Sequence, residues 1–101
     1  MTVYFVVNAD VTDNEQLTRY RAATTATFEG HDLEVLVSDN EAAVIEGDPI
    51  GTRVVVLRFP DRDAFERWYH SPAYQAIIGM RTASTDGVAL LATDRRPPAA
   101  D

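Results

Sequence analysis

With 101 residues, 46% of them hydrophobic, the chain is long enough for one small domain with a thin core. Its net charge of −7 argues against nucleic-acid binding, since phosphates would repel it, and no segment approaches the roughly 20 apolar residues of a membrane span. Cysteine and lysine are absent, which excludes disulfides, thiolate chemistry and Schiff-base chemistry. The first residues lack the basic and apolar regions of a signal peptide, so we expect a cytoplasmic protein.

The first 30 residues predict a strand and then a helix. Residues 3–7 are apolar without alternation and rich in β-branched and aromatic side chains, which indicates a strand covered on both faces. Thr12 and Glu15 fit a capping box, so we expect a helix from there to about residue 28, with Gly30 as its stop. Side chains at three- and four-residue steps would form its buried face: Leu17, Tyr20, Thr24 and Phe28.

The middle of the chain predicts strands but leaves their number open. Residues 33–37 have the composition of a second strand, and a turn signal follows it. Residues 42–46 are either a further strand or the continuation of the second strand after a bend. In both cases we expect them to form an antiparallel hairpin with the apolar strand at 54–59, across a loop at 47–51.

The stretch from 54 to 81 organises the rest of the sequence. Pro60 stops its strand and Asp61 caps a helix, and Ser71 followed by Pro72 caps a second helix. The inner faces of these two helices would carry Ala64, Phe65, Trp68, Tyr69, Tyr74, Ile77, Ile78 and Arg81.

The end of the chain predicts one more strand. Residues 82–86 are expected to be a connector, and residues 88–92 a final strand. Residues 95–101 are polar and rich in proline, so we expect a flexible tail after a single domain at 1–94.

The order of elements predicts an α+β fold of the ferredoxin-like βαββαβ type, an antiparallel sheet with both helices on one face. The strands at 3–7 and 54–57 are apolar on both sides, so the helix-free face would expose Val54 and Val56 together with either Tyr4 and Val6 or the alternate residues of the first strand. A patch of several hundred Å² is more than monomers usually expose, and covering it would contribute on the order of 10 kcal/mol before association costs. We therefore expect a homodimer that packs sheet against sheet.

Three segments and one arginine carry a family resemblance. Residues 46–47 (Glu-Gly), 54–61 (ending Phe-Pro-Asp) and 68–75 (Trp-Tyr-His-Ser-Pro-Ala-Tyr-Gln), together with Arg81, resemble the domain of unknown function 1330 family of the dimeric α+β barrel superfamily. The resemblance spans roughly residues 4–93 and implies the same fold and a dimer. It implies no reaction, because the superfamily includes cofactor-free monooxygenases, isomerases, cyclases, haem enzymes and proteins without known activity.

Two positions depart from that family. Gly30-His31 stands where relatives commonly have two glycines followed shortly by arginine, and Arg58 stands where they often have an acid before Phe-Pro. The resemblance therefore does not carry a shared ligand over to this chain.

A pocket between helices and sheet is the expected binding site. An aromatic box with one arginine suits a small planar or carboxylate-bearing molecule, and its candidate ligand-binding residues are Tyr20, Glu46, Trp68, Tyr69, Tyr74 and Arg81. The other reading of the aromatic residues is that they are core side chains with their hydroxyls bonded to the backbone. Arg81 has its own alternative, an ion pair with an acid such as Glu46.

The two histidines are the candidate catalytic residues. His31 and His70 have unperturbed pKa values that suit proton transfer near neutral pH, although both lie where side chains are usually exposed. The cluster of His31, Asp32 and Glu34 is a weak metal signal, and no glycine-rich phosphate loop or dinucleotide motif occurs, so no metal and no cofactor are expected.

Two functions follow. The first is a homodimeric protein that binds a small organic ligand between helices and sheet. The alternative is a cofactor-free enzyme, an isomerase, cyclase or monooxygenase acting on a small aromatic or carbonyl metabolite. The enzyme requires a histidine or Glu46 in the same cavity as Arg81.

Overall fold

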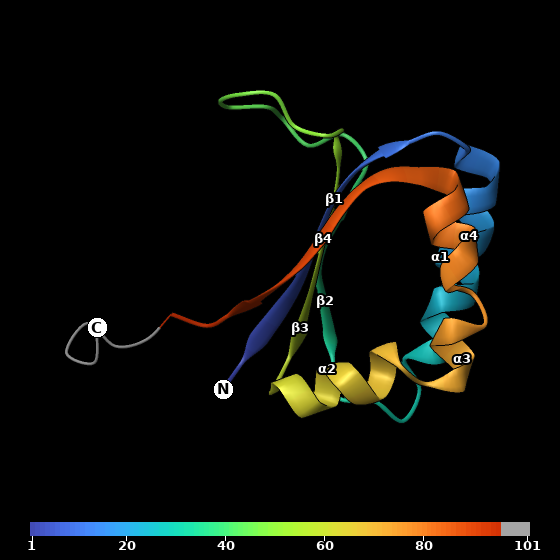
Figure 1. Ribbon diagram of the computed structural model, residues 1–101, viewed down its shortest axis with the longest axis vertical. Coiled ribbons are helices and arrows are strands. Elements are labelled where there is room, and N and C mark those ends of the chain that lie inside the picture. The colour runs from blue at the N-terminus through green and yellow to red at the C-terminus, as the bar shows by residue number, and fades with distance from the viewer. Residues whose placement is uncertain (96–101) are drawn as a thin grey trace.

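A four-stranded antiparallel sheet carries all of the helices on one face (Figure 1). The computed structural model describes residues 1–95, and the strands are ordered β2-β3-β1-β4. The elements along the chain are β1 (Val3–Val11), α1 (Asn14–Thr27), β2 (Glu34–Asp39), β3 (Arg53–Phe59), α2 (Arg62–Tyr69), α3 (Pro72–Gln75), α4 (Ile78–Ser84) and β4 (Thr85–Thr93). This confirms the ferredoxin-like α+β fold, with the second helical region divided into three short helices.

The first helix begins one residue later than the sequence predicts. Asp13, not Thr12, is its N-cap, and the Asp13 carboxylate accepts a hydrogen bond of 3.0 Å from the backbone N–H of Gln16. The N–H groups of both Thr12 and Asp13 donate to the carbonyl of Ser84, at 2.9 and 3.2 Å, at the point where β1 leaves its pairing with β4. Gly30 has a φ of 79°, as expected of a glycine that follows a helix end.

The predicted hairpin between residues 42–46 and 54–59 is wrong. Residues 42–46 form no strand, and β3 pairs with β2 on one side and β1 on the other. Residues 40–52 instead form a projecting loop, here called the arm (Figure 1). Its apolar side chains have no layer to pack against within one subunit, and Ile45 is 87% exposed.

The root of the arm is fixed by polar contacts with β1 and β3. The side-chain amide of Asn8 donates to the carbonyls of Gly51 and Arg53 at 2.9 and 3.2 Å, and its oxygen accepts from the N–H of Ile50 at 3.1 Å. Gly51 lies so close to β1 that a Cβ there would collide with the backbone of Ala9. The arm therefore leaves the sheet at a defined place.

The region of residues 82–86 is not the expected connector. The last helix, α4, continues to Ser84 and β4 starts at the next residue. The reason is local: the fully buried Ser84 hydroxyl donates to the carbonyl of Met80 at 2.6 Å, while its own carbonyl accepts from residues 12 and 13. The caps predicted at Asp61 and Ser71, with Pro72 in the first turn, are confirmed. Apart from residue 95, the predicted tail lies outside the described residues.

The core lies between the helices and the covered face of the sheet. Phe5 on β1 and Phe59 on β3 contact an aromatic cluster from α2 and α3, and Trp68 and Tyr74 are almost wholly buried with ring centroids 4.1 Å apart. These rings supply the largest apolar contribution to stability on this side.

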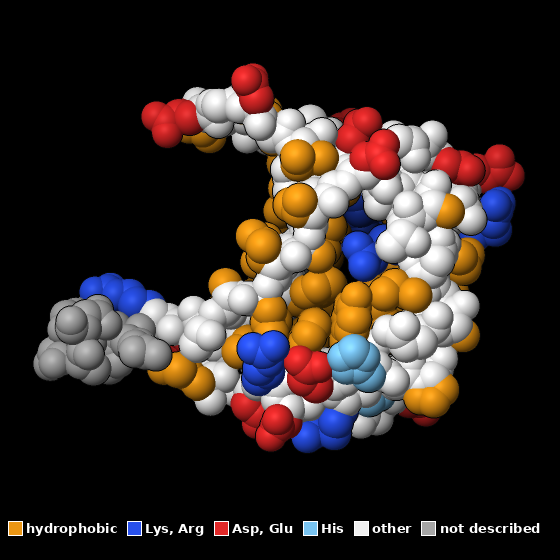
Figure 2. All heavy atoms as spheres, in the orientation of Figure 1, with side chains coloured by type: hydrophobic (Ala, Val, Ile, Leu, Met, Phe, Trp, Pro, Cys, Tyr) orange, Lys and Arg blue, Asp and Glu red, His pale blue; other side chains and the backbone are white. Residues whose placement is uncertain are grey.

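The other face of the sheet, here called the bare face, has no helix over it. Strand register places Val6 opposite Val56 on one side and Leu90 on the other, so apolar side chains form a row across the strands. Leu90 is 64% exposed, and Figure 2 shows hydrophobic side chains along this side of the sheet. Of the two options left open by the sequence, Tyr4 and Val6 accompany Val54 and Val56 on the bare face. The apolar side chains of the bare face are Tyr4, Val6, Val37, Val54, Val56, Val88 and Leu90.

Among residues 1–95, no helix has the length and apolar character needed to cross a membrane.

Candidate ligand-binding site

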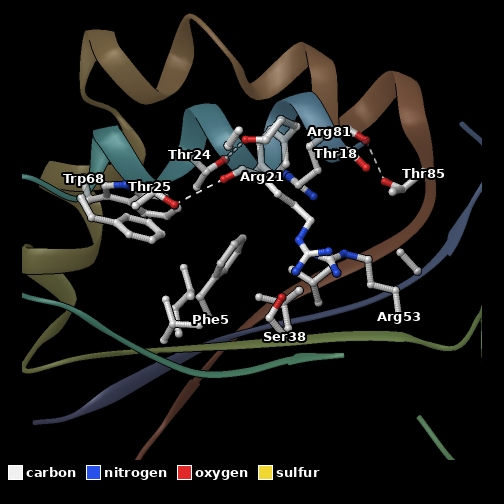
Figure 3. A pocket seen from close by; sticks show the side chains of 18 residues that line it. Phe5, Thr18, Arg21, Thr24, Thr25, Ser38, Arg53, Trp68, Arg81 and Thr85 are labelled. Atoms are coloured by element: carbon white, nitrogen blue, oxygen red, sulfur yellow. Dashed lines mark hydrogen bonds between the residues drawn. The ribbon is translucent and has the colours of Figure 1, made fainter. Parts of the chain in front are cut away.

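A cavity of about 380 Å³ lies between the helices and the covered face of the sheet. Its floor is apolar and comes from alternate residues of β1 and β3, including Phe5, Val7, Val55 and Leu57. Phe28 and Trp68 also line it, and Trp68 lies at one end (Figure 3). A concave, mostly apolar space of this size is typical of small-molecule sites.

Three arginines from three different elements line the cavity: Arg21 on α1, Arg53 on β3 and Arg81 on α4. Figure 3 shows the guanidinium groups of Arg21 and Arg53 pointing toward each other across the space. Arg53 is only 6% exposed, whereas Arg21 is exposed at the mouth. Burial, and then the positive charge of Arg21, lower the pKa of Arg53 below its ordinary value.

Within the cavity lining no acidic side chain opposes these arginines, although Asp86 lines an adjoining depression together with Arg81. The lining contains no aspartate, glutamate or histidine, and none of the three forms an ion pair with a residue of 1–95. Arg53 donates to the side-chain oxygen of Asn40 at 2.6 Å, which is a neutral partner. The Nε of Arg81 is buried and has no hydrogen-bond partner among residues 1–95. A cavity with this charge balance favours an anion.

Two tyrosines support the wall next to Arg81. The hydroxyls of Tyr20, which lines the cavity, and Tyr74, which lies behind it, are 2.8 Å apart. Tyr74 is fully buried, and this burial, together with the neighbouring Tyr20, raises the pKa of the Tyr74 hydroxyl far above its usual range, although Arg81 opposes the shift. Tyr74 is therefore a neutral group at physiological pH and does not compensate Arg81.

The indole of Trp68 is held in place from the opposite side. Its N–H donates to the hydroxyl of Thr27 at 3.1 Å, and that hydroxyl donates in turn to the carbonyl of Thr24 at 2.7 Å. Both threonines belong to the buried face of α1, so the helix that carries Arg21 also orients the ring at the apolar end.

The structure brings together some of the predicted ligand-binding residues. Tyr20, Trp68 and Arg81 line the cavity. Tyr69 and Tyr74 do not line it but pack against Trp68, with ring centroids 6.2 and 4.1 Å away.

The remaining predicted site residues lie elsewhere. Glu46 is on the exposed arm and lines a shallow depression with Asn8 and Val54, not the arginine cavity. His70 is 64% exposed and its Nε2 is 2.9 Å from a carboxylate oxygen of Glu66. His31 lies just after α1 and is also outside the cavity lining. Catalysis by these histidines stays a prediction, and neither stands beside Arg81.

Sequence reasoning missed Arg21 and Arg53. A signal existed for both of them. Thr18, Arg21 and Thr25 repeat at three- and four-residue steps beside the buried stripe of α1, which marks a second stripe facing the mouth. Arg53 stands two residues before Val55 and four before Leu57, so strand alternation directs all three side chains to the same face.

Comparison with protein families gives one match. The model of the family described as Domain of unknown function (DUF1330) matches residues 2–94. The chain belongs to the DUF1330 family. No curated protein matches its sequence.

Solved structures share the fold of this DUF1330 protein. A protein of unknown function from Rhodopseudomonas palustris has a TM-score of 0.78 at 15% identity, covering 95% of this chain and 84% of its own. SnoaB, a cofactor-independent oxygenase from Streptomyces nogalater, has a TM-score of 0.66 at 22% identity and 96% coverage of both chains. A dimeric ferredoxin-like protein of unknown function from Thermobifida fusca has a TM-score of 0.63 at 16% identity, covering 90% of this chain and 89% of its own. At these identities the likeness establishes the fold alone.

The chemistry available in the DUF1330 cavity is that of anion binding. The titratable side chains in its lining are one tyrosine and three arginines, so the lining offers donors and positive charge but no side chain that ordinarily titrates near neutral pH. Within the part of the chain that the structure describes, no group of three His, Cys, Asp or Glu side chains could hold a metal ion.

Proposed function

We propose that this protein is a homodimer that binds a small organic ligand in the cavity between its helices and its sheet. The observation that carries the proposal is the cavity itself, about 380 Å³ with an apolar floor at one end and three arginines at the other. Polar groups that converge from separate elements on an otherwise apolar space are the usual construction of a specific ligand site.

The bare face supports the homodimer. Seven mostly apolar side chains gather there around the row formed by Val56, Val6 and Leu90, and Val88 and Leu90 are 48% and 64% exposed in one subunit. Water contact with such a row is unfavourable, and a second copy with the same face is a self-complementary partner. The Thermobifida fusca protein of the same fold is itself described as dimeric.

An enzyme of the cofactor-free type is the second candidate. It is favoured by one observation, the likeness of fold to SnoaB, which is a cofactor-independent oxygenase. The cavity lining argues for the simpler role, because it contains neither histidine nor Glu46, and a proton would have to be moved by Tyr20 or by the substrate itself. Ligand binding is therefore the better-supported function.

The test is a thermal-shift comparison of two tryptophan variants of α1. Ala22 is exposed and lines the mouth of the cavity, while Ala26, one turn further along, is also exposed but lies outside the lining. Benzyl alcohol, benzoate, phthalate and indole-3-acetate are titrated against wild type, Ala22→Trp and Ala26→Trp. We expect at least one compound to stabilise wild type and Ala26→Trp, and to lose that effect in Ala22→Trp because the mouth is blocked. Equal stabilisation of both variants would place binding elsewhere and contradict the proposal.

The dimer has a separate test. Sedimentation velocity at micromolar concentration should give a species of twice the 11.2 kDa chain mass. A single subunit at that concentration would contradict the homodimer without bearing on the cavity.

A further inference from the structure

We propose that the ligand of the cavity is an apolar, ring-sized molecule with two negative charges at one end, and that Arg21, Arg53 and Arg81 bind those charges. This inference rests on the proposed function and adds the chemical class of the ligand.

The charges of the cavity lining favour an anionic ligand. Three guanidinium groups face one space, and the described chain supplies no carboxylate to that space. Arg21 and Arg53 point toward each other, so their like charges repel (Figure 3). A singly charged ligand would leave two of the three cations uncompensated. A dianion would leave only one.

Arg81 has a hydrogen-bond donor without an acceptor among the described residues. Its buried Nε–H lacks a partner in residues 1–95, and a buried N–H without an acceptor is destabilising. Tyr74 stands next to it but keeps its proton, since burial opposes the phenolate. A shift of the Arg81 side chain that exposes this N–H to the cavity would let an acceptor of the ligand complete its bonding, and ionised oxygens form the strongest such bonds with arginine.

The distribution of side chains gives the orientation. Trp68 and Phe5 lie toward one side of the cavity, and the guanidinium groups of Arg21 and Arg53 lie toward the other (Figure 3). A ring would pack against Trp68 and Phe5, which places its charged groups at the arginines. Two neighbouring carboxylates and one phosphate monoester share this chemistry, so both belong in the test.

The experiment is calorimetric titration at pH 8 with four probes that share one ring: phthalate, phenyl phosphate, benzoate and benzyl alcohol. Wild type is compared with Arg21→Gln, Arg81→Gln and the control Arg67→Gln, an exposed arginine of α2 outside the cavity. We expect at least one dianion to bind roughly tenfold or more tightly than benzoate, and each cavity variant to lose about tenfold of that affinity. Affinity for benzyl alcohol, and all affinities of Arg67→Gln, should stay unchanged.

The outcomes separate the two levels of the proposal. Binding of benzoate or benzyl alcohol as tight as that of both dianions, or dianion binding that is insensitive to Arg21→Gln and Arg81→Gln, would overturn the charge assignment and leave the proposed cavity function intact. Failure of all four probes to bind would overturn both.

A second measurement needs no ligand. The chain carries a net charge of −7, so loss of a cation would ordinarily lower its stability or leave it unchanged. In the absence of ligand, Arg21→Gln should instead raise Tm by roughly 2 °C at low salt, because it removes the repulsion of Arg53, and the gain should shrink in 0.5 M NaCl. The control Arg67→Gln should lower Tm or leave it unchanged. A Tm that also falls in Arg21→Gln would overturn the inference that the cavity arginines repel one another and favour an anionic ligand.

Discussion

The two faces of the sheet reverse the usual distribution of polarity. On the covered face, where helices exclude water, a buried arginine of β3 lies among phenylalanine, valine and leucine, and two more arginines reach the same space. On the bare face, where charges would be expected, alternate residues of the same strands form an apolar row. The two proposals explain this contrast. An anionic ligand would complete the covered face, and a second copy of the chain would complete the bare face.

The largest effect is expected in the covered core. Trp68→Ala should lower the free energy of unfolding by about 4 kcal/mol, because Trp68 is almost fully buried and its removal leaves a large void among aromatic rings. Urea unfolding followed by circular dichroism measures the change. A loss below about 1 kcal/mol would contradict the close packing of Trp68 in the core between the helices and the covered face.

The next effect concerns the bare face. Leu90→Glu places two carboxylates in the proposed interface of the dimer, one from each copy, and should weaken association by roughly 100-fold, or about 2.8 kcal/mol. Ala26→Glu, on the exposed side of α1, adds the same charge away from that face and should leave the dimer intact. Sedimentation equilibrium compares the two variants. If both variants associate like wild type, the bare face is not the interface.

A smaller effect is expected where the arm joins the bare face. Asn8→Ala removes three hydrogen bonds at the arm's root and should cost about 2 kcal/mol, with faster amide hydrogen exchange at residues 50–53. Asn14→Ala, at an exposed position of α1, is the control. Unchanged exchange at residues 50–53 in Asn8→Ala would show that Gly51 and the backbone hold the arm by themselves.

The smallest effect tests the wall between core and cavity. Tyr74→Phe should cost about 1 kcal/mol, because it removes the buried hydrogen bond with Tyr20.

The same variant should change the alkaline stability of the protein. The pKa of Tyr74 is raised in the folded state, so its stabilisation is fully present below pH 10 and is lost as pH rises above 10, where the unfolded chain releases the proton first. The slope for this one group is about 1.4 kcal/mol per pH unit. Wild type should therefore lose stability between pH 10 and 11.5 more steeply than Tyr74→Phe, in urea unfolding followed by circular dichroism. Tyr4→Phe on the bare face is the control, and parallel curves for wild type and Tyr74→Phe would contradict the burial of this hydroxyl.

Local chemistry made much of the fold predictable. Asp61 and the Ser71-Pro72 pair favour the start of a helix through local hydrogen bonds and backbone geometry. Both caps are found where the sequence predicts them. Thr12 was wrong as the cap, because β1 pairs with β4 as far as Val11 and Asp13 caps the helix, and no local pattern reveals the length of that tertiary pairing. The arm was mistaken for a strand because Val44 and Ile45 have β-forming side chains. Whether such residues join a sheet depends on a free strand edge, and both edges of β3 are already paired.

The site was predictable only in part, for a related reason. The aromatic residues were predicted because they continue the apolar faces of the helices, and Arg81 was predicted because it is a charged residue on such a face. The roles of Arg21 and Arg53 depend on how α1 lies over the sheet, and sequence spacing alone carries no information about that distance. Glu46 was a candidate ligand-binding residue and a possible ion-pair partner of Arg81, but it lies on the exposed arm and outside the cavity lining.

Fluorescence of Trp68 tests most directly the claim that an organic anion occupies the covered face. It is the only tryptophan of the chain and it lines the cavity, so its emission is sensitive to what occupies that space. Titration with phthalate or phenyl phosphate should change the emission in a saturable way, with a midpoint that moves about tenfold higher in Arg81→Gln. A response to both compounds that stays linear with concentration, or a midpoint identical in wild type and Arg81→Gln, would contradict the account.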